Sequence, residues 1–243
     1  MESGNQKLVH CADHNRTLVI MAKAPRPGLV KTRLHHSLSS LAVTALYGCL
    51  LEDTVARAKS LTSVNVAVMC PESDKGELEL FLDNSVRVVA QKGEGLAAGL
   101  ISVFAEFTTA GRQRVIAFNS DGPHLAPSVL DSAFQALAEC DLVIGPTYDG
   151  GYYLVGAKAS HPTLFENDGL GTSSALERLL ARAQALKLSN SLTEPFYDID
   201  LAEDLFRLAP ELALAPTRAP QTAAWLARWG QVLRQAHRRM GER

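Results

Sequence analysis

The sequence lacks the segments that direct a chain into or across a membrane. Residues 1–16 are polar and contain no apolar stretch of the kind a secretory signal needs, and no run is long and apolar enough to span a bilayer. The four cysteines, Cys11, Cys49, Cys70 and Cys140, are widely scattered and do not predict a disulfide framework. We expect a cytoplasmic protein with no membrane partner, whose residues 1–16 form a disordered tail.

The chain also lacks an excess of positive charge. Its formal net charge is -2, whereas a dedicated nucleic-acid binder needs a positive surface to displace counterions from phosphate backbones. We therefore expect no nucleic-acid partner, while small anionic ligands stay compatible with this charge. The sequence leaves open whether the protein forms a homodimer.

Two familiar nucleotide motifs are missing. The Walker sequence is absent, and the first strand-like run, 17–21, is not followed by Gly-x-Gly-x-x-Gly, which argues against a dinucleotide-binding oxidoreductase. Acidic residues are missing too, since no Asp or Glu occurs from Lys23 through Leu51. The positive charge in this stretch is therefore local.

Short runs rich in Val and Ile alternate with helix-length segments, which predicts a mainly parallel sheet covered by crossover helices. With 243 residues, 47% of them hydrophobic, the chain can bury one large core. We predict a single-domain, three-layer Rossmann-like α/β fold over residues 17–215 and a C-terminal helix, 216–243, packed on it. The strand-like runs are 17–21, 65–69, 86–90, 114–118, 142–145 and 152–155, and helical spacing occurs over 40–59, 127–137 and 172–188.

Basic residues cluster directly after the first strand-like run. Lys23, Arg26, Lys31 and Arg33 lie on one predicted loop together with Gly28. A loop at the ligand end of a strand can bind a polyphosphate through backbone N–H groups while its cationic side chains neutralise the charge. The alternative is a solvated basic turn.

Carboxylates in two further segments, at Asp121 and at Asp198 and Asp200, suggest a cation site. Asp121 follows the buried run 114–118, at the tip of the sheet, and Mg²⁺ is typically bound through one or two carboxylates plus substrate phosphate oxygens. The alternative is an aspartate that forms a turn or caps the next helix. Asp198 and Asp200 share one face if extended and can complete the metal site. Alternatively, Asp200 and Glu203 have the spacing of a capping box.

Two small motifs are candidates for the acceptor side of the site. Asp149, Gly150 and Gly151 precede the last strand-like run, and paired glycines let a ligand approach the backbone closely. An Asp-Gly hairpin turn is the alternative. Thr172 precedes a predicted helix, where it can receive an anion or simply cap the helix.

Together these motifs resemble a bacterial family of provisionally assigned glycosyltransferases, the selenodomain-associated transferase family, within the nucleotide-diphospho-sugar transferase superfamily. The matching segments follow the family's order at 23–34, 120–123, 141–152 and 198–205. The resemblance implies a GT-A-like fold, a nucleotide donor, and Mg²⁺ or Mn²⁺.

The resemblance also implies roles for single residues. Lys23, Lys31 and Arg33 correspond to the phosphate loop, Asp121 to the metal-associated aspartate, and Asp198 or Asp200 to a second one. We predict that Asp121, Lys31 and Arg33 are catalytic. The residues predicted to bind nucleotide are Lys23, Arg26, Gly28, Lys31, Arg33 and Ser120.

The charge of the first loop favours one reaction over another. Nucleotidyl transfer expels pyrophosphate, whose charge requires more Lys and Arg than the nucleoside diphosphate expelled in sugar transfer. The arrangement is also similar to that of 2-phospholactate and molybdenum-cofactor guanylyltransferases. We therefore predict a metal-dependent transfer from a nucleoside triphosphate to a small anionic acceptor. The alternatives are a glycosyltransferase using a nucleotide sugar and an inactive nucleotide-binding module.

Overall fold

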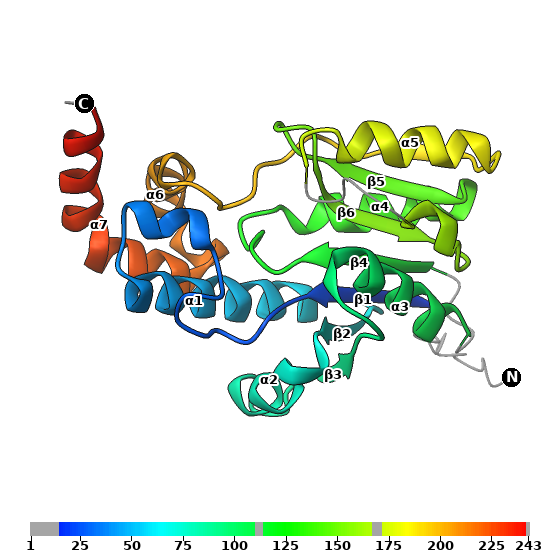
Figure 1. Cartoon of the computed structure of the whole chain (residues 1–243), viewed down its shortest axis with the longest axis horizontal. Coiled ribbons are helices and arrows are strands. Elements are labelled where there is room, and N and C mark those ends of the chain that lie inside the picture. Colours follow the sequence, from blue (N-terminus) through cyan, green and yellow to red (C-terminus); the bar gives the residue numbers. More distant parts are fainter. Residues whose placement is uncertain (1–14, 110–113, 167–171, 242–243) are drawn as a thin grey trace, which may run out of the picture.

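The computed structural model describes residues 15–109, 114–166 and 172–241 (Figure 1). Residues 1–14 of the predicted tail, which include Cys11, lie outside the described residues. Within the described residues, no helix combines the length and apolar character needed to cross a membrane.

The strands of the described residues form one seven-stranded sheet in the order β3-β2-β1-β4-β6-β5-β7. All neighbouring pairs are parallel except those of β6, which runs antiparallel to both β4 and β5. This confirms the predicted α/β fold with a mainly parallel sheet. The strands are β1 Arg16–Met21, β2 Asn65–Cys70, β3 Arg87–Ala90, β4 Arg114–Asn119, β5 Leu142–Pro146, β6 Tyr152–Ala157 and β7 Asn190–Leu192.

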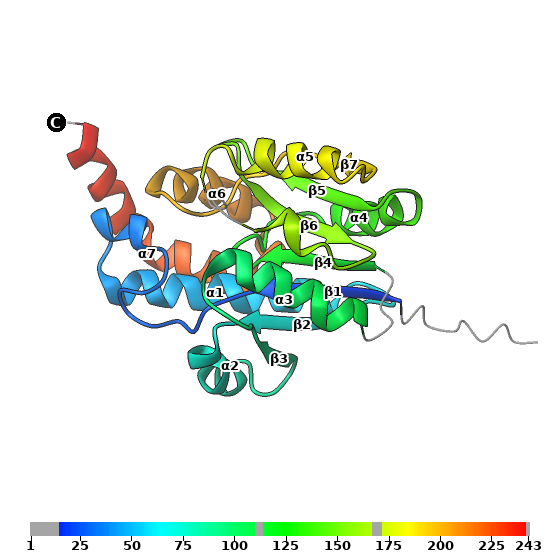
Figure 2. The same ribbon diagram turned by 45° about the vertical axis from the view of Figure 1, so that its right-hand side comes forward.

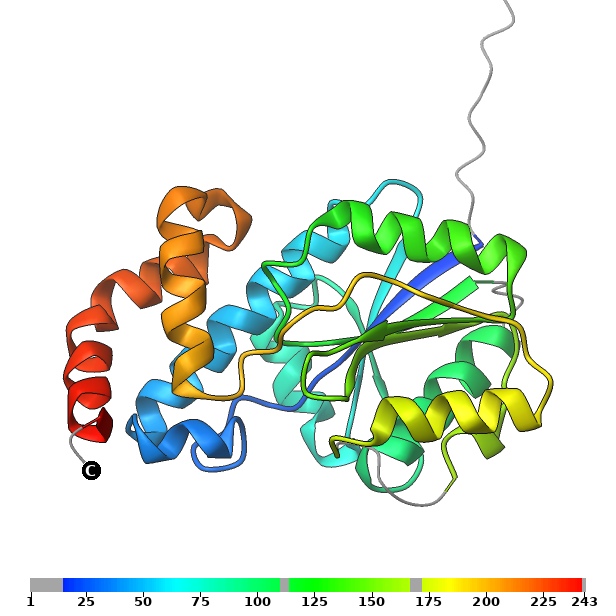
Figure 3. The same cartoon turned by 90° about the horizontal axis from the view of Figure 1, so that it is seen from above.

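Helices cover both faces of the sheet and give three layers (Figure 3). Tyr47 on α1, Leu78 on α2 and Phe134 on α4 are buried on one face, and Phe104 on α3 and Leu179 on α5 are buried on the other. The helices are α1 Ser40–Lys59, α2 Lys75–Phe81, α3 Gly95–Thr109, α4 Pro127–Glu139, α5 Ala175–Ala185, α6 Ala202–Leu214 and α7 Pro220–Gly241.

A helical lobe, made of α6, α7 and the part of α1 they contact, lies beyond the carboxyl ends of the parallel strands (Figures 1 and 2). Leu46 of α1, Leu205 of α6 and Trp225 of α7 share its buried apolar cluster. The predicted C-terminal helix thus exists and packs on α1 and α6, while the proposed division of the chain at residue 216 stays a prediction.

The carboxylate of Asp53, buried on α1, joins that helix to the start of α7. Its Oδ1 accepts a hydrogen bond from the backbone N–H of Gln221 at 3.1 Å, and its Oδ2 accepts one from Thr222 at 2.7 Å. A carboxylate at a helix N-terminus satisfies backbone donors that have no partner within the helix and interacts favourably with the helix dipole.

Replacing Asp53 with Ala is expected to lower the free energy of unfolding by about 2–3 kcal/mol, because two N–H groups lose their acceptor. Urea unfolding followed by circular dichroism measures the change. Asp53→Asn is the matched control, since it keeps one acceptor oxygen and should lose less. A loss below about 0.5 kcal/mol for Asp53→Ala, the scale of a neutral surface change, contradicts this role.

Candidate active site

The site lies where the order of strands reverses direction. From β1 the chain continues to β2 and β3 on one side, whereas from β4 it continues toward the other edge, and Met21 of β1 pairs with Asn119 of β4. In open α/β sheets, ligands bind outside the carboxyl ends of the strands at such a switch point. The basic loop after β1 and the Asp121 segment after β4 both begin there.

Lys31 connects these two segments to a third. Its ammonium group forms an ion pair with the Asp121 carboxylate and lies 2.8 Å from Oδ1 of Asp200. The Arg33 guanidinium lies 3.6 Å from the other oxygen of Asp200. The side chains of Lys31 and Asp121 are only 10% and 9% exposed, so water screens their interaction weakly. The structure therefore brings together four of the predicted residues.

The backbone of Lys31 adopts an uncommon conformation. Its φ of 46° and ψ of 47° place it in the left-handed region, just before the short 3₁₀ helix Thr32–His36. For a residue with a Cβ atom this costs about 1–2 kcal/mol, and such strain concentrates at functional sites. The ion pairs of the ammonium group oppose this cost.

Asp198 adds a third carboxyl group to the site. The side-chain amide of Asn119 donates a hydrogen bond to its Oδ1 at 3.1 Å. Burial raises the pKa of Asp198 to about 6, Lys31 opposes this shift, and the negative charges of Asp200 and Asp149 add to it. Burial also disfavours ionisation of Asp200, but Lys31 and then Arg33 outweigh it and lower its pKa.

This donor set fits a cation that takes its remaining ligands from a substrate. Within the described residues, no group of three or more His, Cys, Asp or Glu side chains is arranged to hold a metal ion by itself. Mg²⁺ usually binds through one or two carboxylates plus phosphate oxygens. Asp121 supplies a buried carboxylate, and the carboxylates of Asp198 and Asp200 are half-buried. The metal site at these three residues stays a prediction.

The capping box expected at Asp200 involves different residues. Oδ2 of Asp204 accepts hydrogen bonds from the backbone N–H groups of Asp200 and Leu201, at 2.9 and 2.7 Å, and Leu201 is the N-cap of α6. The alternative that paired Asp200 with Glu203 is therefore wrong, because α6 begins one residue later than that spacing assumed. The Asp200 carboxylate is left to face Lys31 and Arg33.

Arg26 is engaged elsewhere in the first loop. Its guanidinium bonds Asp74 at 3.0 Å, Glu77 at 2.8 Å and the carbonyl oxygen of Ser73 at 2.7 Å, while Asp74 also accepts from the Ala24 N–H at 2.8 Å. These contacts fix the loop to the segment after β2. The predicted nucleotide-binding role of Arg26 remains untested, and its observed role is that of an anchor.

A buried tyrosine that sequence reasoning missed joins the two loops. The Tyr47 hydroxyl accepts a hydrogen bond from the Lys23 N–H at 2.9 Å and lies 3.1 Å from the Ser120 hydroxyl. The Ser120 carbonyl oxygen accepts a hydrogen bond from the hydroxyl of Thr54, which lies on α1 like Tyr47, at 3.2 Å. A buried tyrosine needs a partner for its hydroxyl. A tyrosine on the apolar face of the helix predicted over 40–59 could therefore have indicated a hydrogen bond to a neighbouring loop. The side chain of Lys23 is exposed. Gly28 is also exposed, and its φ of 82° lies in the left-handed region.

The Asp149-Gly150-Gly151 segment forms the turn of the β5–β6 hairpin, as its alternative interpretation expected. Oδ1 of Asp149 accepts hydrogen bonds from the Thr147 hydroxyl at 2.5 Å and the Gly151 N–H at 3.2 Å. Gly150 contacts the segment before α5, where Thr172 lies exposed. Thr147 pairs with Phe196, two residues before Asp198, so this turn lies beside the segment that carries Asp198. The acceptor role of these residues stays a prediction.

Gly150 and Gly28 offer a matched pair of substitutions. Both have positive φ angles, 87° and 82°, but a Cβ on Gly150 would lie 2.0 Å from the Ser173 carbonyl oxygen, whereas a Cβ on Gly28 meets nothing within 4 Å. Gly28→Ala is expected to cost about 1–2 kcal/mol of unfolding free energy, and Gly150→Ala about 3 kcal/mol or more. Urea unfolding measures the unfolding free energy of both variants. Equal losses of unfolding free energy would contradict the crowding at Gly150.

His124 is packed inside the structure against two aromatic rings. It is 1% exposed, and its ring lies 4.4 Å from that of Phe196 and 4.5 Å from that of Tyr197. Burial lowers its pKa to about 3, with further contributions from the positive charges of Arg218, Arg207 and Arg57. The imidazole is therefore neutral in the folded protein near pH 7.

Because the unfolded chain has a histidine pKa of about 6.5, His124 takes up a proton on unfolding. Its contribution to stability is full above pH 6.5 and decreases as the pH falls from 6.5 toward 3. On going from pH 7 to pH 5, the unfolding free energy of the wild type should fall by about 2 kcal/mol more than that of His124→Phe, which has no titrating group at this position. The difference in unfolding free energy between the two proteins therefore changes with pH. Urea unfolding at both pH values measures this gap, and a constant gap contradicts the assignment.

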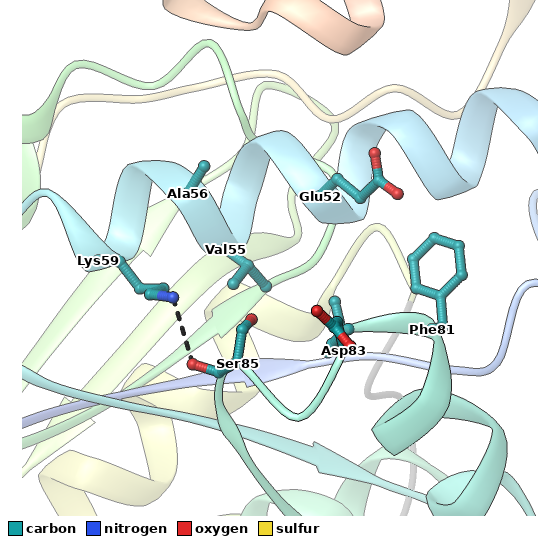
Figure 4. A pocket seen from close by; sticks show the side chains of 8 residues that line it. Glu52, Val55, Ala56, Lys59, Phe81, Asp83 and Ser85 are labelled. Atoms are coloured by element: carbon teal, nitrogen blue, oxygen red, sulfur yellow. Dashed lines mark hydrogen bonds between the residues drawn. The ribbon is translucent and has the colours of Figure 1, made fainter.

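A hollow lies between α1 and the end of α2 (Figure 4). Val55 and Phe81 provide apolar walls, and Lys59 donates a hydrogen bond to the Ser85 carbonyl oxygen at 3.2 Å. None of the predicted site residues lines it.

The sequence matches a family model described as "Uncharacterized protein conserved in bacteria (DUF2064)" over residues 54–172. No match was found among curated proteins. The solved structures with this fold include a provisionally assigned nucleotide-diphospho-sugar transferase from Desulfovibrio desulfuricans G20, with 23% identity and a TM-score of 0.84, covering 91% of this chain and 98% of that one.

Two further structures share the fold at lower similarity. A cytidylyltransferase from Leptospira borgpetersenii has 13% identity and a TM-score of 0.56, covering 90% of this chain and 96% of that one. CMP:2-keto-3-deoxy-manno-octonic acid synthetase, complexed with CTP, has 11% identity and a TM-score of 0.53, covering 82% and 99%. These structures confirm the Rossmann-like α/β fold predicted from the sequence.

Proposed function

We propose that this protein is a metal-dependent transferase that moves a nucleotidyl group from a nucleoside triphosphate to a small anionic acceptor. The observation that carries the proposal is the cluster of Lys31, Arg33, Asp121 and Asp200 at the β1/β4 switch point. It combines cationic groups for a polyphosphate with carboxylates for a cation. The names of the Leptospira and CTP-bound relatives agree with this class of reaction.

In this reaction an acceptor oxygen bonds to the α-phosphorus, the bond from that phosphorus to the bridging oxygen breaks, and pyrophosphate leaves. Lys31 and Arg33 stabilise the negative charge on the leaving group, and exposed Lys23 adds to the positive field. Asp121, assisted by Asp198 or Asp200, would hold Mg²⁺ or Mn²⁺, and the cation would neutralise charge at the phosphate oxygens. Positioning and electrostatic stabilisation dominate such chemistry, so no covalent nucleophile is required.

Sugar transfer from a nucleotide sugar is the second candidate. The description of the Desulfovibrio relative as a nucleotide-diphospho-sugar transferase favours it. In that reaction the donor is a nucleotide sugar, whose diphosphate carries less negative charge than the triphosphate of the first candidate. The basic loop is therefore better explained by the first candidate.

Ligand stabilisation distinguishes the two donors. The four ribonucleoside triphosphates and a panel of nucleotide sugars are added with and without Mg²⁺, and the unfolding midpoint is recorded. At 100 times its dissociation constant a ligand adds about 2.7 kcal/mol, which for a chain of this size shifts the midpoint by roughly 5–10 °C. We expect this shift with one triphosphate and Mg²⁺. A shift confined to nucleotide sugars contradicts the proposal.

A further inference from the structure

The ammonium group of Lys31 lies against the same carboxylates that are suited to a cation. It contacts Asp121 and lies 2.8 Å from Oδ1 of Asp200, in a setting where both Lys31 and Asp121 are about nine-tenths buried. Two positive groups cannot be brought close together on one pair of carboxylates in a weakly screened setting without strong repulsion. A divalent cation at Asp121 therefore competes with this ammonium group.

We propose that Lys31 and a divalent cation are alternative partners of the Asp121 and Asp200 carboxylates, so that cation binding releases Lys31 to the triphosphate. This proposal rests on the proposed function for the destination of Lys31, but the exchange itself concerns only the cation and the protein. Arg33 does not share this role, because it is 62% exposed and lies 3.6 Å from Asp200 alone.

The backbone supports such an exchange. Lys31 has its left-handed conformation at the junction between the first loop and the 3₁₀ helix Thr32–His36. The ion pairs of its side chain are among the interactions that hold this conformation, and losing them favours a return of φ to negative values. Movement of the ammonium group is thus coupled to movement of the loop that carries Gly28, which is free to adopt other φ values.

A consequence is that cation and triphosphate bind cooperatively. Without triphosphate, the cation must displace the ammonium group from the two carboxylates with which it forms ion pairs. With triphosphate, the phosphate oxygens receive the ammonium group, and the cation gains phosphate ligands as well. By linkage, each ligand raises the affinity of the other by the same factor.

The first test measures Mn²⁺ binding without nucleotide by electron paramagnetic resonance, in the wild type, Lys31→Met and Arg33→Met. Methionine keeps the length of the side chain but removes its charge. We expect Lys31→Met to bind Mn²⁺ at least tenfold more tightly than the wild type, and Arg33→Met to change the affinity less than threefold. Unchanged or weaker binding by Lys31→Met, the same gain in Arg33→Met, or no Mn²⁺ binding by any of the three overturns the proposal.

A second test uses the wild type alone, so that it does not depend on the folding of a variant. Lysine acetylation is followed residue by residue by mass spectrometry, with exposed Lys23 as the internal reference. Saturating Mg²⁺ should raise the labelling rate of Lys31 severalfold and leave that of Lys23 unchanged. Unchanged or slower labelling of Lys31 overturns the exchange. Because neither test contains nucleotide, their failure is distinguishable from failure to release pyrophosphate, which bears only on the proposed reaction.

Discussion

Replacing Asp121 with Asn is expected to lower the rate of nucleotidyl transfer by about 10²–10³-fold, the scale reported for loss of one preorganised electrostatic group. The substitution keeps the shape of the side chain but removes the negative charge that faces Lys31 and that we assign to the cation. A neutral amide is a weaker ligand for Mg²⁺ than a carboxylate. Steady-state pyrophosphate release at several Mg²⁺ concentrations measures the effect, and raising Mg²⁺ should recover part of the lost rate.

Asp131→Asn is the control for the Asp121 variant. Asp131 lies half exposed on α4, 3.4 Å from Arg16 and outside the proposed site, so its substitution should leave the rate within about twofold. Full activity in Asp121→Asn, with a circular dichroism spectrum like that of the wild type, contradicts the assignment of Asp121 to the cation.

Replacing Lys31 with Met is expected to produce the second large effect, a loss of about 10²–10³-fold in kcat/KM for the triphosphate. The variant lacks the cationic group that we assign to the polyphosphate. It also leaves Asp121 buried without its ion pair, which costs about 3–5 kcal/mol of stability when one partner of a buried pair is removed. Activity and unfolding free energy must therefore be measured on the same preparation.

The double variant Lys31→Met/Asp121→Asn separates these two effects. Because it removes both charges, it should unfold at a higher urea concentration than Lys31→Met alone, yet show no recovery of activity. Recovery of the transfer rate together with stability contradicts a direct role of Lys31 on the triphosphate. A small effect of Lys31→Met on donor binding favours sugar transfer instead.

The positions of Lys31 and Asp121 could be predicted because each follows a buried, apolar strand, and the ends of parallel strands meet at one edge of a sheet. Their direct contact could not, because it depends on the left-handed backbone of Lys31. Asp200 was also predicted as a candidate for the site. Its alternative role in a capping box with Glu203 is wrong, because α6 begins at Ala202 and Asp204 is the capping partner.

Contacts between distant elements were beyond sequence reasoning. Arg26 was grouped with the phosphate loop by its neighbours in sequence, yet its guanidinium bonds Asp74 and Glu77, which follow β2. Nothing in a local pattern separates a cation that binds a carboxylate of the protein from one left for a ligand. Tyr47 was missed for the same reason, because its hydroxyl partners come from two other segments.

The sheet was predicted well where its strands are apolar and less well at one edge. The short loop 147–151 joins β5 to β6 as a hairpin, and such a loop is too short for the crossover a parallel pair needs. The direction of β6 was therefore encoded in its loop length. β7, Asn190–Leu192, has three residues, and neither Asn190 nor Leu192 is buried, so it carries no apolar run that a sequence pattern could detect.

The most direct test of the proposed reaction follows the α-phosphorus of the donor. The protein is incubated with Mg²⁺, each ribonucleoside triphosphate labelled at the α-phosphate, and a fraction of small anionic metabolites. Our account predicts that the label enters a new small product with one pyrophosphate released per product. Chelation of Mg²⁺ should abolish both, and Asp121→Asn should lower the rate of both by about 10²–10³-fold. Release of a nucleoside diphosphate from a nucleotide sugar, with no pyrophosphate formed from any triphosphate, would contradict it.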